Sequence, residues 1–340
     1  GDDLDPVDLG TGRTAVAITA GGSHTCAVLD NGSVKCWGYV APAVGMDDDP
    51  DLLGDEPGEM GDDLAVVDLG EGRIAVAITA GASHTCVMLA DGSVKCWGSG
   101  GGGRLGSGGS DWLGDEPGEM GDDLDPVDLG TGRTAVAITA GEYHTCAVLD
   151  DESVKCWGNG RNGERGDGRK GAVGDGPGEM GDNLKAANLG TGRTVVAVTA
   201  GTYHTCAALD DASVKCFGSS SRGKLGNGLQ RRGHAVGNEP SHMGDNLAVV
   251  ALGAGRGVVY GPVGVRRAVM GRMQRAVSAF ESAERAVVVA VENRDRAQLV
   301  LEIADSALVI ARSTQLNLHQ AALNLQGVAD GLVTVAEEAV

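Results

Sequence analysis

Four copies of one short motif contain the residues of this chain that could do chemistry. Each copy reads His-Thr-Cys, nine further residues, a second Cys, an aromatic residue and Gly. Imidazole and thiolate groups can transfer protons, attack electrophiles or bind metals, and two cysteines can also form a disulfide. The spacing within the motif has to decide among these chemistries. The copies are His24–Gly38, His84–Gly98, His144–Gly158 and His204–Gly218.

The turn between the two cysteines favours a disulfide. Residues 30–32, Asp-Asn-Gly, form a three-residue loop with Gly at the left-handed position, which is a standard hairpin connection. Counting outward from this loop places Cys26 opposite Cys36. If the loop closes on a hydrogen-bonded pair, the cysteines face each other at a non-hydrogen-bonded site, where Cα atoms are about 4.5 Å apart. That distance suits a disulfide. We therefore predict the pairs Cys26–Cys36, Cys86–Cys96, Cys146–Cys156 and Cys206–Cys216.

Two other uses of these cysteines stay open at this point. His24, Cys26 and Cys36 could supply three ligands to zinc, since His24 and Cys26 share one face of a strand. Against zinc, no Cys-x-x-Cys pair and no fourth ligand is near. The cysteines could also be buried free thiols. Mass analysis with and without reductant would separate the three alternatives.

The four histidines do not resemble a catalytic group. An active site is usually one asymmetric constellation, whereas these histidines recur in one structural register. We expect hydrogen-bonded structural histidines near the junctions between repeats, and aromatic residues that fill the core. Because the sequence has no nucleophile–base pair, phosphate loop or metal motif, we expect no enzymatic activity and no cofactor. The residues concerned are His24, His84, His144, His204, Trp37, Trp97, Trp157 and Phe217.

The motif sits inside a repeat of 60 residues. Each unit contains four short apolar stretches, which in the first unit are residues 7–13, 15–21, 24–29 and 33–38. Stretches this short, divided by Gly and Asp, predict the four strands of a β-propeller blade. Helices usually need about 10–12 residues, so a helical solenoid is excluded. The units are residues 1–60, 61–120, 121–180 and 181–243, followed by a stub at residues 244–253 that begins a fifth.

A third block completes a recognisable pattern. In the second unit, residues 103–108 read Gly-Arg-Leu-Gly-Ser-Gly after the Trp-Gly. Together with the preceding strands, this block resembles the chromosome-condensation-regulator repeat, whose blades read Ala/Cys-Gly-x-x-His-Thr, Gly-x-Val-x-x-Trp-Gly and Asn-x-x-Gly-Gln-Leu-Gly. The resemblance covers residues 1–252 and departs at residues 39–45 and at Phe217. It implies a β-propeller that serves as a protein-interaction platform.

The number of units bears on whether the propeller closes. The family usually closes a ring of seven blades, whereas this chain has four units and a partial fifth. We therefore expect an incomplete ring, meaning a fragment, a truncated homologue or an arc completed by another chain. A closed four-bladed ring is the alternative.

The composition changes after residue 253. Residues 254–264 read as a Gly-rich linker, and cysteine is absent from there on. In residues 265–340, apolar side chains such as Met273, Val277 and Phe280 recur at helical spacing, which predicts an α-helical segment. Its helices would pair with each other or with another chain. A fused or out-of-frame tail is the alternative.

Charge limits the partners. The net charge is −20, and the excess lies in residues 1–253, because residues 254–340 contain nine basic and nine acidic residues. Such a surface repels phosphate backbones, so we expect no nucleic acid. No apolar run approaches the ~18–20 residues of a membrane span. The acidic loops at residues 54–63, 114–123 and 174–183 could bind calcium, but their spacing matches neither an EF-hand loop nor a Gly-Gly-x-Gly-x-Asp array and favours a solvated surface.

These observations predict a function class. Pairing of all eight cysteines implies an oxidising compartment, hence an extracellular, periplasmic or cell-surface protein. We predict a non-catalytic module that binds an unidentified protein partner through propeller faces and loops. The alternatives are a structural surface or stalk protein that self-associates through residues 265–340, and a calcium-binding surface protein.

Overall fold

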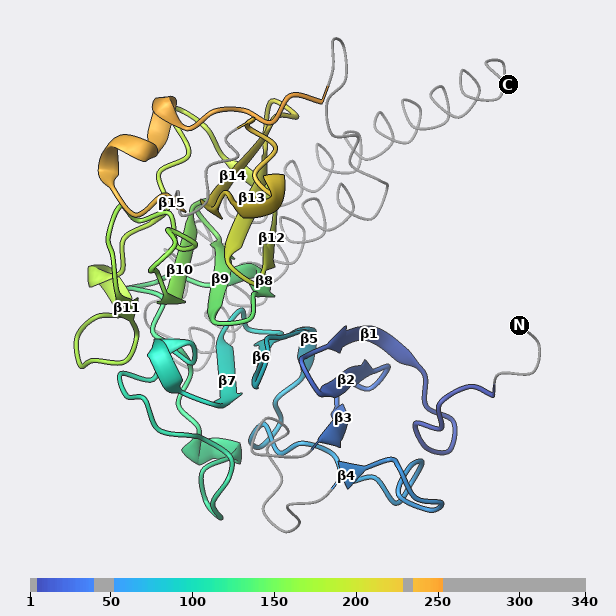
Figure 1. The fold of residues 1–340 in the computed structure, drawn as a ribbon. Coiled ribbons are helices and arrows are strands. Elements are labelled where there is room, and N and C mark those ends of the chain that lie inside the picture. Colours follow the sequence, from blue (N-terminus) through green and yellow to red (C-terminus); the bar gives the residue numbers. More distant parts are fainter. Residues whose placement is uncertain (1–4, 40–51, 229–234, 253–340) are drawn as a thin grey trace, which may run out of the picture. The chain divides into compact units, whose positions relative to one another are not determined.

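The computed structural model describes residues 5–39, 52–228 and 235–252, which form four antiparallel sheets (Figure 1). The chain divides into two units at residues 259 and 260, and all described residues belong to the first. The predicted linker at residues 254–264 and the predicted helical segment at residues 265–340 lie outside the described residues. Within the described part, no helix has both the length and the apolar character needed to cross a membrane.

Each sheet comes from one repeat unit, with its strands in sequence order. Three sheets have four strands, and the second has three strands plus one bridge, between Gly98 and Leu113. The strands are β1 (Ala15–Ala20), β2 (His24–Leu29), β3 (Val34–Tyr39), β4 (Leu52–Leu53), β5 (Ala75–Ala80), β6 (His84–Leu89), β7 (Val94–Gly98), β8 (Ala135–Ala140), β9 (His144–Leu149), β10 (Val154–Asn159), β11 (Ala172–Val173), β12 (Val195–Gly201), β13 (His204–Leu209), β14 (Val214–Ser219) and β15 (Ala235–Val236). Short 3-10 helices lie in the connections: η2 (Gly101–Gly103), η3 (Gly121–Asp123), η4 (Gly181–Asn183), η5 (Ser221–Gly223), η6 (Pro240–His242) and η7 (Gly244–Asn246).

The central hairpin has the predicted register. Leu29 N donates to Ser33 O at 2.8 Å, and Val28 then pairs with Val34 and Cys26 with Cys36. The same register recurs in the other three sheets. The third loop residue takes a positive φ in every copy, at 80° for Gly32 and 81° for Gly92. The third and fourth hairpins place Glu152 and Ala212 there, at 66° and 63°.

Because of this difference between the turns, replacing alanine by glycine at this position should stabilise the protein, and replacing glycine by alanine should destabilise it. A left-handed φ strains any residue with a Cβ by about 1–2 kcal/mol, so Ala212→Gly should stabilise the protein by about 1 kcal/mol, reduced somewhat by the entropy of glycine. Gly92→Ala should destabilise it by more, because the added Cβ would lie 2.7 Å from Thr134 Cβ. Urea unfolding of both variants checks the two signs, and a stabilising Gly92→Ala would contradict this explanation of the turn.

One of the four strands predicted for each unit is wrong, and the structure has a different one in its place. Residues 7–13 form no strand, and the fourth strand of the first sheet is β4, only two residues long, in the connection after β3. The same holds for β11 and β15. Two residues are too few to show an alternating pattern, which explains why the sequence gives no signal for them.

In the second, third and fourth units, the stretch before the first strand instead lies against the preceding sheet. Val67 N, from the second unit, donates to Val34 O of the first at 2.8 Å, and Lys35 Nζ reaches Gly61 O at 2.5 Å. The stub does the same for the fourth sheet: Val250 N donates to Val214 O, and Lys215 Nζ donates to Gly244 O. The structural blade is thus offset from the sequence repeat, and the fourth blade takes its last segment from the stub.

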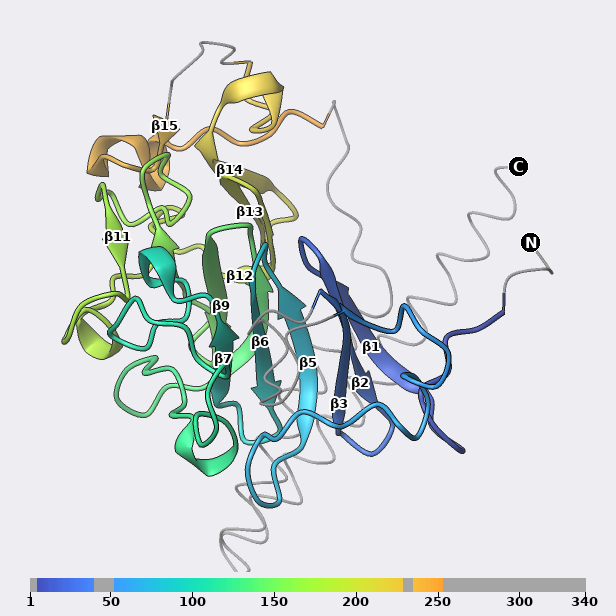
Figure 2. The same ribbon diagram turned by 60° about the horizontal axis from the view of Figure 1, so that its bottom comes forward.

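Neighbouring sheets share their cores. The first strands of the four sheets, β1, β5, β8 and β12, are the inner strands and are successive neighbours (Figure 1). Figure 2 shows β1 and β5 side by side. Three apolar clusters each combine residues of two adjacent sheets. In the first cluster, the pair Cys26–Cys36 packs with Trp97 of the next sheet. The same arrangement brings Cys86–Cys96 to Trp157 and Cys146–Cys156 to Phe217. Each junction therefore buries a disulfide against an aromatic ring.

Candidate functional site

The structure joins the eight cysteines in the four pairs that the sequence predicts. The Cα atoms of each pair are 4.0–4.1 Å apart, between neighbouring strands of one sheet. None of the eight is free. Because each sulfur is bonded to its partner, the thiolates needed for zinc binding or nucleophilic attack are not present.

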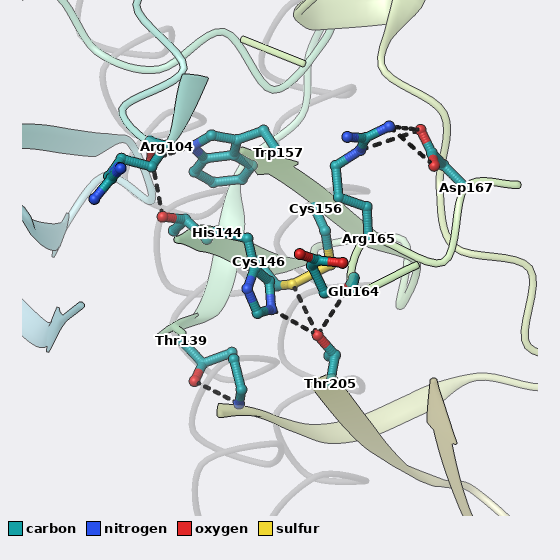
Figure 3. The surroundings of a disulfide bond; sticks show 12 residues. Arg104, Thr139, His144, Cys146, Cys156, Trp157, Glu164, Arg165, Asp167 and Thr205 are labelled. Carbon is teal, nitrogen blue, oxygen red and sulfur yellow. Dashed lines mark hydrogen bonds and ion pairs between the residues drawn. A yellow bond between two sulfur atoms is a disulfide. The ribbon is translucent and has the colours of Figure 1, made fainter. Parts of the chain in front are cut away.

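Each motif histidine of the first three sheets bonds to a threonine of the next sheet. His144 Nε2 lies 2.8 Å from Thr205 Oγ1 (Figure 3), and the pairs His24–Thr85 and His84–Thr145 have distances of 2.8 and 2.9 Å. Thr205 Oγ1 itself donates to Glu164 O at 2.7 Å. A hydroxyl has one proton, so it must accept from the histidine, and Nε2 of His144 carries the ring proton.

Burial fixes the protonation state of these rings. His84 and His144 are fully buried, and loss of hydration lowers the pKa of each to about 3. Arg104 adds a smaller lowering effect at His84, and His204 does so at His144. Both rings are neutral at physiological pH. Their Nδ1 atoms are buried without a partner in the described residues. A neutral ring that is fixed between two sheets acts as a structural hydrogen-bond donor.

Close packing against the histidine ring explains the glycine that directly follows β1, β5 and β8 and that ends β12. A Cβ built on Gly81 would lie 2.1 Å from Cε1 of His84 and 2.5 Å from Gly141 O. No other residue fits there without moving the ring or the next sheet. The Ala-Gly-x-x-His element of the repeat is therefore a requirement of junction packing.

The aromatic residue that follows the second cysteine lies in the core in three of the four sheets. Trp97, Trp157 and Phe217 are fully buried. Trp157 Nε1 donates to Arg104 O at 3.0 Å (Figure 3). Thr145 Oγ1 donates to the same oxygen at 2.9 Å. Trp37 is only partly buried, because among the described residues no sheet precedes the first one.

The third unit replaces a buried leucine with an ion pair. Arg165 occupies the position of Leu105 and Leu225, and its side chain has no exposed surface. The guanidinium donates to Gly158 O at 3.1 Å and to Gly171 O at 2.6 Å, and Nη2 lies 3.0 Å from Asp167 (Figure 3). All its strong interactions are internal, so it serves the fold of the third sheet.

This ion pair predicts a test with a built-in control. Removing one partner of a buried pair leaves an unpaired charge, so Asp167→Asn should destabilise the protein by about 3–5 kcal/mol. The double variant Arg165→Leu/Asp167→Ser copies the second unit and should be neutral or stabilising. Denaturant midpoints of both variants check this. A double variant as unstable as the single one would contradict it.

Some carboxylates of the acidic loops accept hydrogen bonds from backbone amides of the same loop. The carboxylate of Glu59 accepts hydrogen bonds from the amides of Gly54, Asp55 and Glu56 at 2.7, 3.1 and 3.1 Å. Glu119 makes the same three bonds and Glu179 makes two of them. These bonds lower the pKa of Glu59. In the part of the chain that is described, no three His, Cys, Asp or Glu residues form a group suited to a metal ion.

A partly exposed aromatic and cationic feature follows the inner strands β8 and β12, and sequence reasoning missed it. The rings of Tyr143 and Tyr203 stack with centroids 5.6 Å apart. Arg104 lies over Tyr143 at 5.1 Å and Lys224 over Tyr203 at 5.6 Å. A hydrogen bond with Glu142 is the main cause that raises the pKa of Tyr143 to about 12. We call these four residues, Arg104, Tyr143, Tyr203 and Lys224, the cation–tyrosine strip.

A shallow depression of about 280 Å³ adjoins this strip. It is lined by the last residues of the inner strands and those that follow: residues 20–22, 80–82, 140–142 and 200–202. Backbone hydrogen bonds connect neighbouring segments of this lining, such as Gly22 N to Gly81 O at 3.2 Å and Ala82 N to Glu142 O at 3.3 Å. Tyr143 and Tyr203 come directly after two of these segments. The depression could accept a protruding side chain, and it contains no acid–base pair.

Comparison with known proteins agrees with this repeat geometry. The family model described as regulator of chromosome condensation (RCC1) repeat matches residues 15–39, 75–104, 135–164 and 195–224. The chain is 28% identical over 246 residues to the ultraviolet-B receptor UVR8 of Arabidopsis thaliana, covering 71% of this chain and 50% of the receptor. It is 29% identical over 224 residues to the human E3 ubiquitin-protein ligase HERC2, covering 63% of this chain and 4% of the ligase.

Solved structures give matches of limited extent. Human WBSCR16 aligns with a TM-score of 0.49 at 16% identity, over 63% of this chain and 50% of that one. Yeast RCC1 (Prp20), in its complex with Kap60, aligns with a TM-score of 0.43 at 21% identity, over 61% and 42%. The chain spans half or less of the length of each relative named here. The four units, with their matching motifs and sheets, belong to the regulator of chromosome condensation (RCC1) repeat family, and the chain is an RCC1-like propeller repeat protein.

Proposed function

We propose that this chain is a non-catalytic protein-interaction module whose partner binds over the cation–tyrosine strip. The observation that carries the proposal is the stack of Tyr143 and Tyr203 with a cation over each ring. Tyrosine and arginine, together with tryptophan, are enriched at energetic hot spots of protein interfaces. Both rings are partly exposed in a chain with only 3% aromatic residues.

The surroundings of the strip support the same proposal. The adjoining depression is lined mainly by Ala and Gly, so few side chains would obstruct a partner segment there. A rigid aromatic platform loses little conformational entropy on binding. Arg104 and Lys224 supply local positive charge on an acidic protein, which favours a partner segment that contains a carboxylate.

The disulfides support an exported location. Disulfides persist in oxidising compartments and are rare in the cytosol. We infer that the module works outside the cytoplasm, in the periplasm, at the cell surface or in the extracellular space. The sensing and ligase activities named for two of its relatives are not part of this proposal, because the chain spans half or less of those proteins.

A capture experiment tests the proposal. The full chain and a Tyr143→Ala/Tyr203→Ala variant are immobilised and exposed to cell-envelope extract under non-reducing conditions. We expect one stoichiometric protein on the wild type and at least tenfold less on the variant. Trp112→Ala is the matched control, since Trp112 is also a partly exposed aromatic residue, outside the strip. Equal capture by wild type and double variant, or loss with the control, would exclude the strip as the binding face.

A further inference from the structure

The three junctions between sheets repeat one set of cross-sheet contacts. Ala75 N donates to Gly32 O at 2.9 Å, and Ala80 N donates to Thr19 Oγ1 at 3.0 Å. The histidine–threonine bond described above is the third contact. The second and third junctions repeat all three. Their bonds are Ala135 N to Gly92 O, Ala140 N to Thr79 Oγ1, Val195 N to Glu152 O and Ala200 N to Thr139 Oγ1, with His84–Thr145 and His144–Thr205.

The first sheet presents one half of this junction to solvent. Its inner strand β1 holds Ala15 and Ala20, which match the donors Ala75 and Ala80 and are exposed, whereas Ala75 and Ala80 are buried. Ile18 is 67% exposed, while its counterpart Ile78 packs into the core shared with the preceding sheet.

The fourth sheet presents the other half. Ala212 O, Thr199 Oγ1 and His204 Nε2 correspond to Gly32 O, Thr19 Oγ1 and His24 Nε2. Across residues 5–39, 52–228 and 235–252, none of these three atoms makes the cross-sheet bond of its counterpart. Thr199 is exposed, whereas Thr19 is partly buried by the sheet that follows it. Each open half matches the other in donors, acceptors and apolar surface.

We propose that a second copy of this chain docks head to tail, with its first sheet on the fourth sheet of its neighbour. The contact would repeat the junction that already holds each pair of sheets together within one chain, with His204 bonding to Thr25 of the second copy. This inference does not depend on the cation–tyrosine strip. A contact between two different surfaces is heterologous, so copies form either a closed ring or a longer row.

The stub determines which residues of the second copy can enter the contact. Residues 247–250 already lie along β14, in the position that residues 64–67 hold along β3 of the first sheet. The second copy therefore contributes from residue 15 onward. Val7 of the second copy would stay outside the contact, because Val250 already makes on the fourth sheet the bond that Val67 makes on the first.

Edge variants of the full chain test the proposal by sedimentation velocity under oxidising conditions. We expect concentration-dependent association of the wild type. Ile18→Asp places a charge on the open face of the first sheet, and Thr199→Asp places one on the open face of the fourth sheet. Each variant alone should be monomeric. An equimolar mixture should form one-to-one pairs, because each variant retains the edge that the other lacks.

A surface control variant and a folding check separate loss of association from misfolding. Val66→Asp changes a residue that is 54% exposed and lies outside the junction contacts, so it should associate like the wild type. Ala20→Glu is a second first-sheet variant if Ile18→Asp does not fold, and near-ultraviolet circular dichroism verifies folding. A monomeric wild type, as expected if residues 253–340 cover the edge, would overturn the proposal. So would variants that associate normally, or a mixture that stays monomeric.

Discussion

Reduction of the four disulfides is expected to unfold the repeats at room temperature. Each bond closes a short loop with cysteines ten residues apart, which on the chain-entropy model contributes about 2–3 kcal/mol. Four bonds together contribute about 10 kcal/mol, comparable to the whole stability of a typical domain. Far-ultraviolet circular dichroism with and without a phosphine reductant, at constant pH, measures the effect. Retention of the full β-sheet signal after complete thiol alkylation would contradict it.

The hairpins should not respond equally. The second and third are both internal, but Gly92 holds the turn of one without strain, whereas Glu152 in the other takes a positive φ at a steric cost. The pair Cys146→Ala/Cys156→Ala should therefore open its hairpin more than Cys86→Ala/Cys96→Ala opens the other. Amide hydrogen exchange along β9 and β6 compares the two variants. Faster exchange in the second hairpin would exclude the turn as the reason.

Mild acid should destabilise the protein well above the pH at which carboxylates protonate. His84 and His144 have a pKa of about 3 when folded and about 6.5 when unfolded. The unfolded state therefore binds more protons below pH 6.5, and the stability from these rings is complete above that pH. It falls as pH drops from 6.5 toward 3. At pH 5 the loss is about 2 kcal/mol for each ring, or about 4 kcal/mol for both.

Denaturant unfolding at pH 7, 6 and 5 measures this loss. The carboxylates with lowered pKa values, including Glu59, Asp62 and Asp182, act in a different window. Their stabilisation is present above about pH 4 and is lost as pH falls further, so it leaves the range from 6.5 to 5 unaffected. His84→Gln should remove one ring's share of the slope in that range, because His24, His144 and His204, whose pKa values burial also lowers, still contribute. A stability that is flat between pH 7 and 5 in the wild type would show that the rings are hydrated.

The hairpin could be predicted because its chemistry is local. The residues between Cys26 and Cys36 contain the turn, the register and the two groups that react, and no distant contact has to be known. The outer segment could not be predicted in the same way. Residues 61–67 contact the sheet before their own unit, so no pattern within one unit reveals where they lie.

Two features had a signal in the sequence that could have been used. A lysine stands between the apolar residues of the third strand in every unit, which is unusual for a buried strand unless its ammonium group has acceptors. Lys95 has them in Leu69 O and Gly121 O, at 3.0 and 2.6 Å. The cation–tyrosine strip also departs from the repeat, because the residue before the histidine is Ser23 in the first unit but Tyr143 and Tyr203 in the last two. A position whose residue type differs between units in this way is one where the packing of the repeat does not require a particular side chain.

A disulfide map of the oxidised chain tests the central claim, that each motif is a covalently closed hairpin in one sheet of a repeat array. Trypsin cleaves after Lys35, Lys95, Lys155 and Lys215, which separates the two cysteines of every pair into different peptides. After digestion under denaturing, non-reducing conditions, we predict four linked peptide pairs by mass spectrometry. They are Cys26 with Cys36, Cys86 with Cys96, Cys146 with Cys156 and Cys206 with Cys216. Free thiols, or any bond between two different units, would contradict the account.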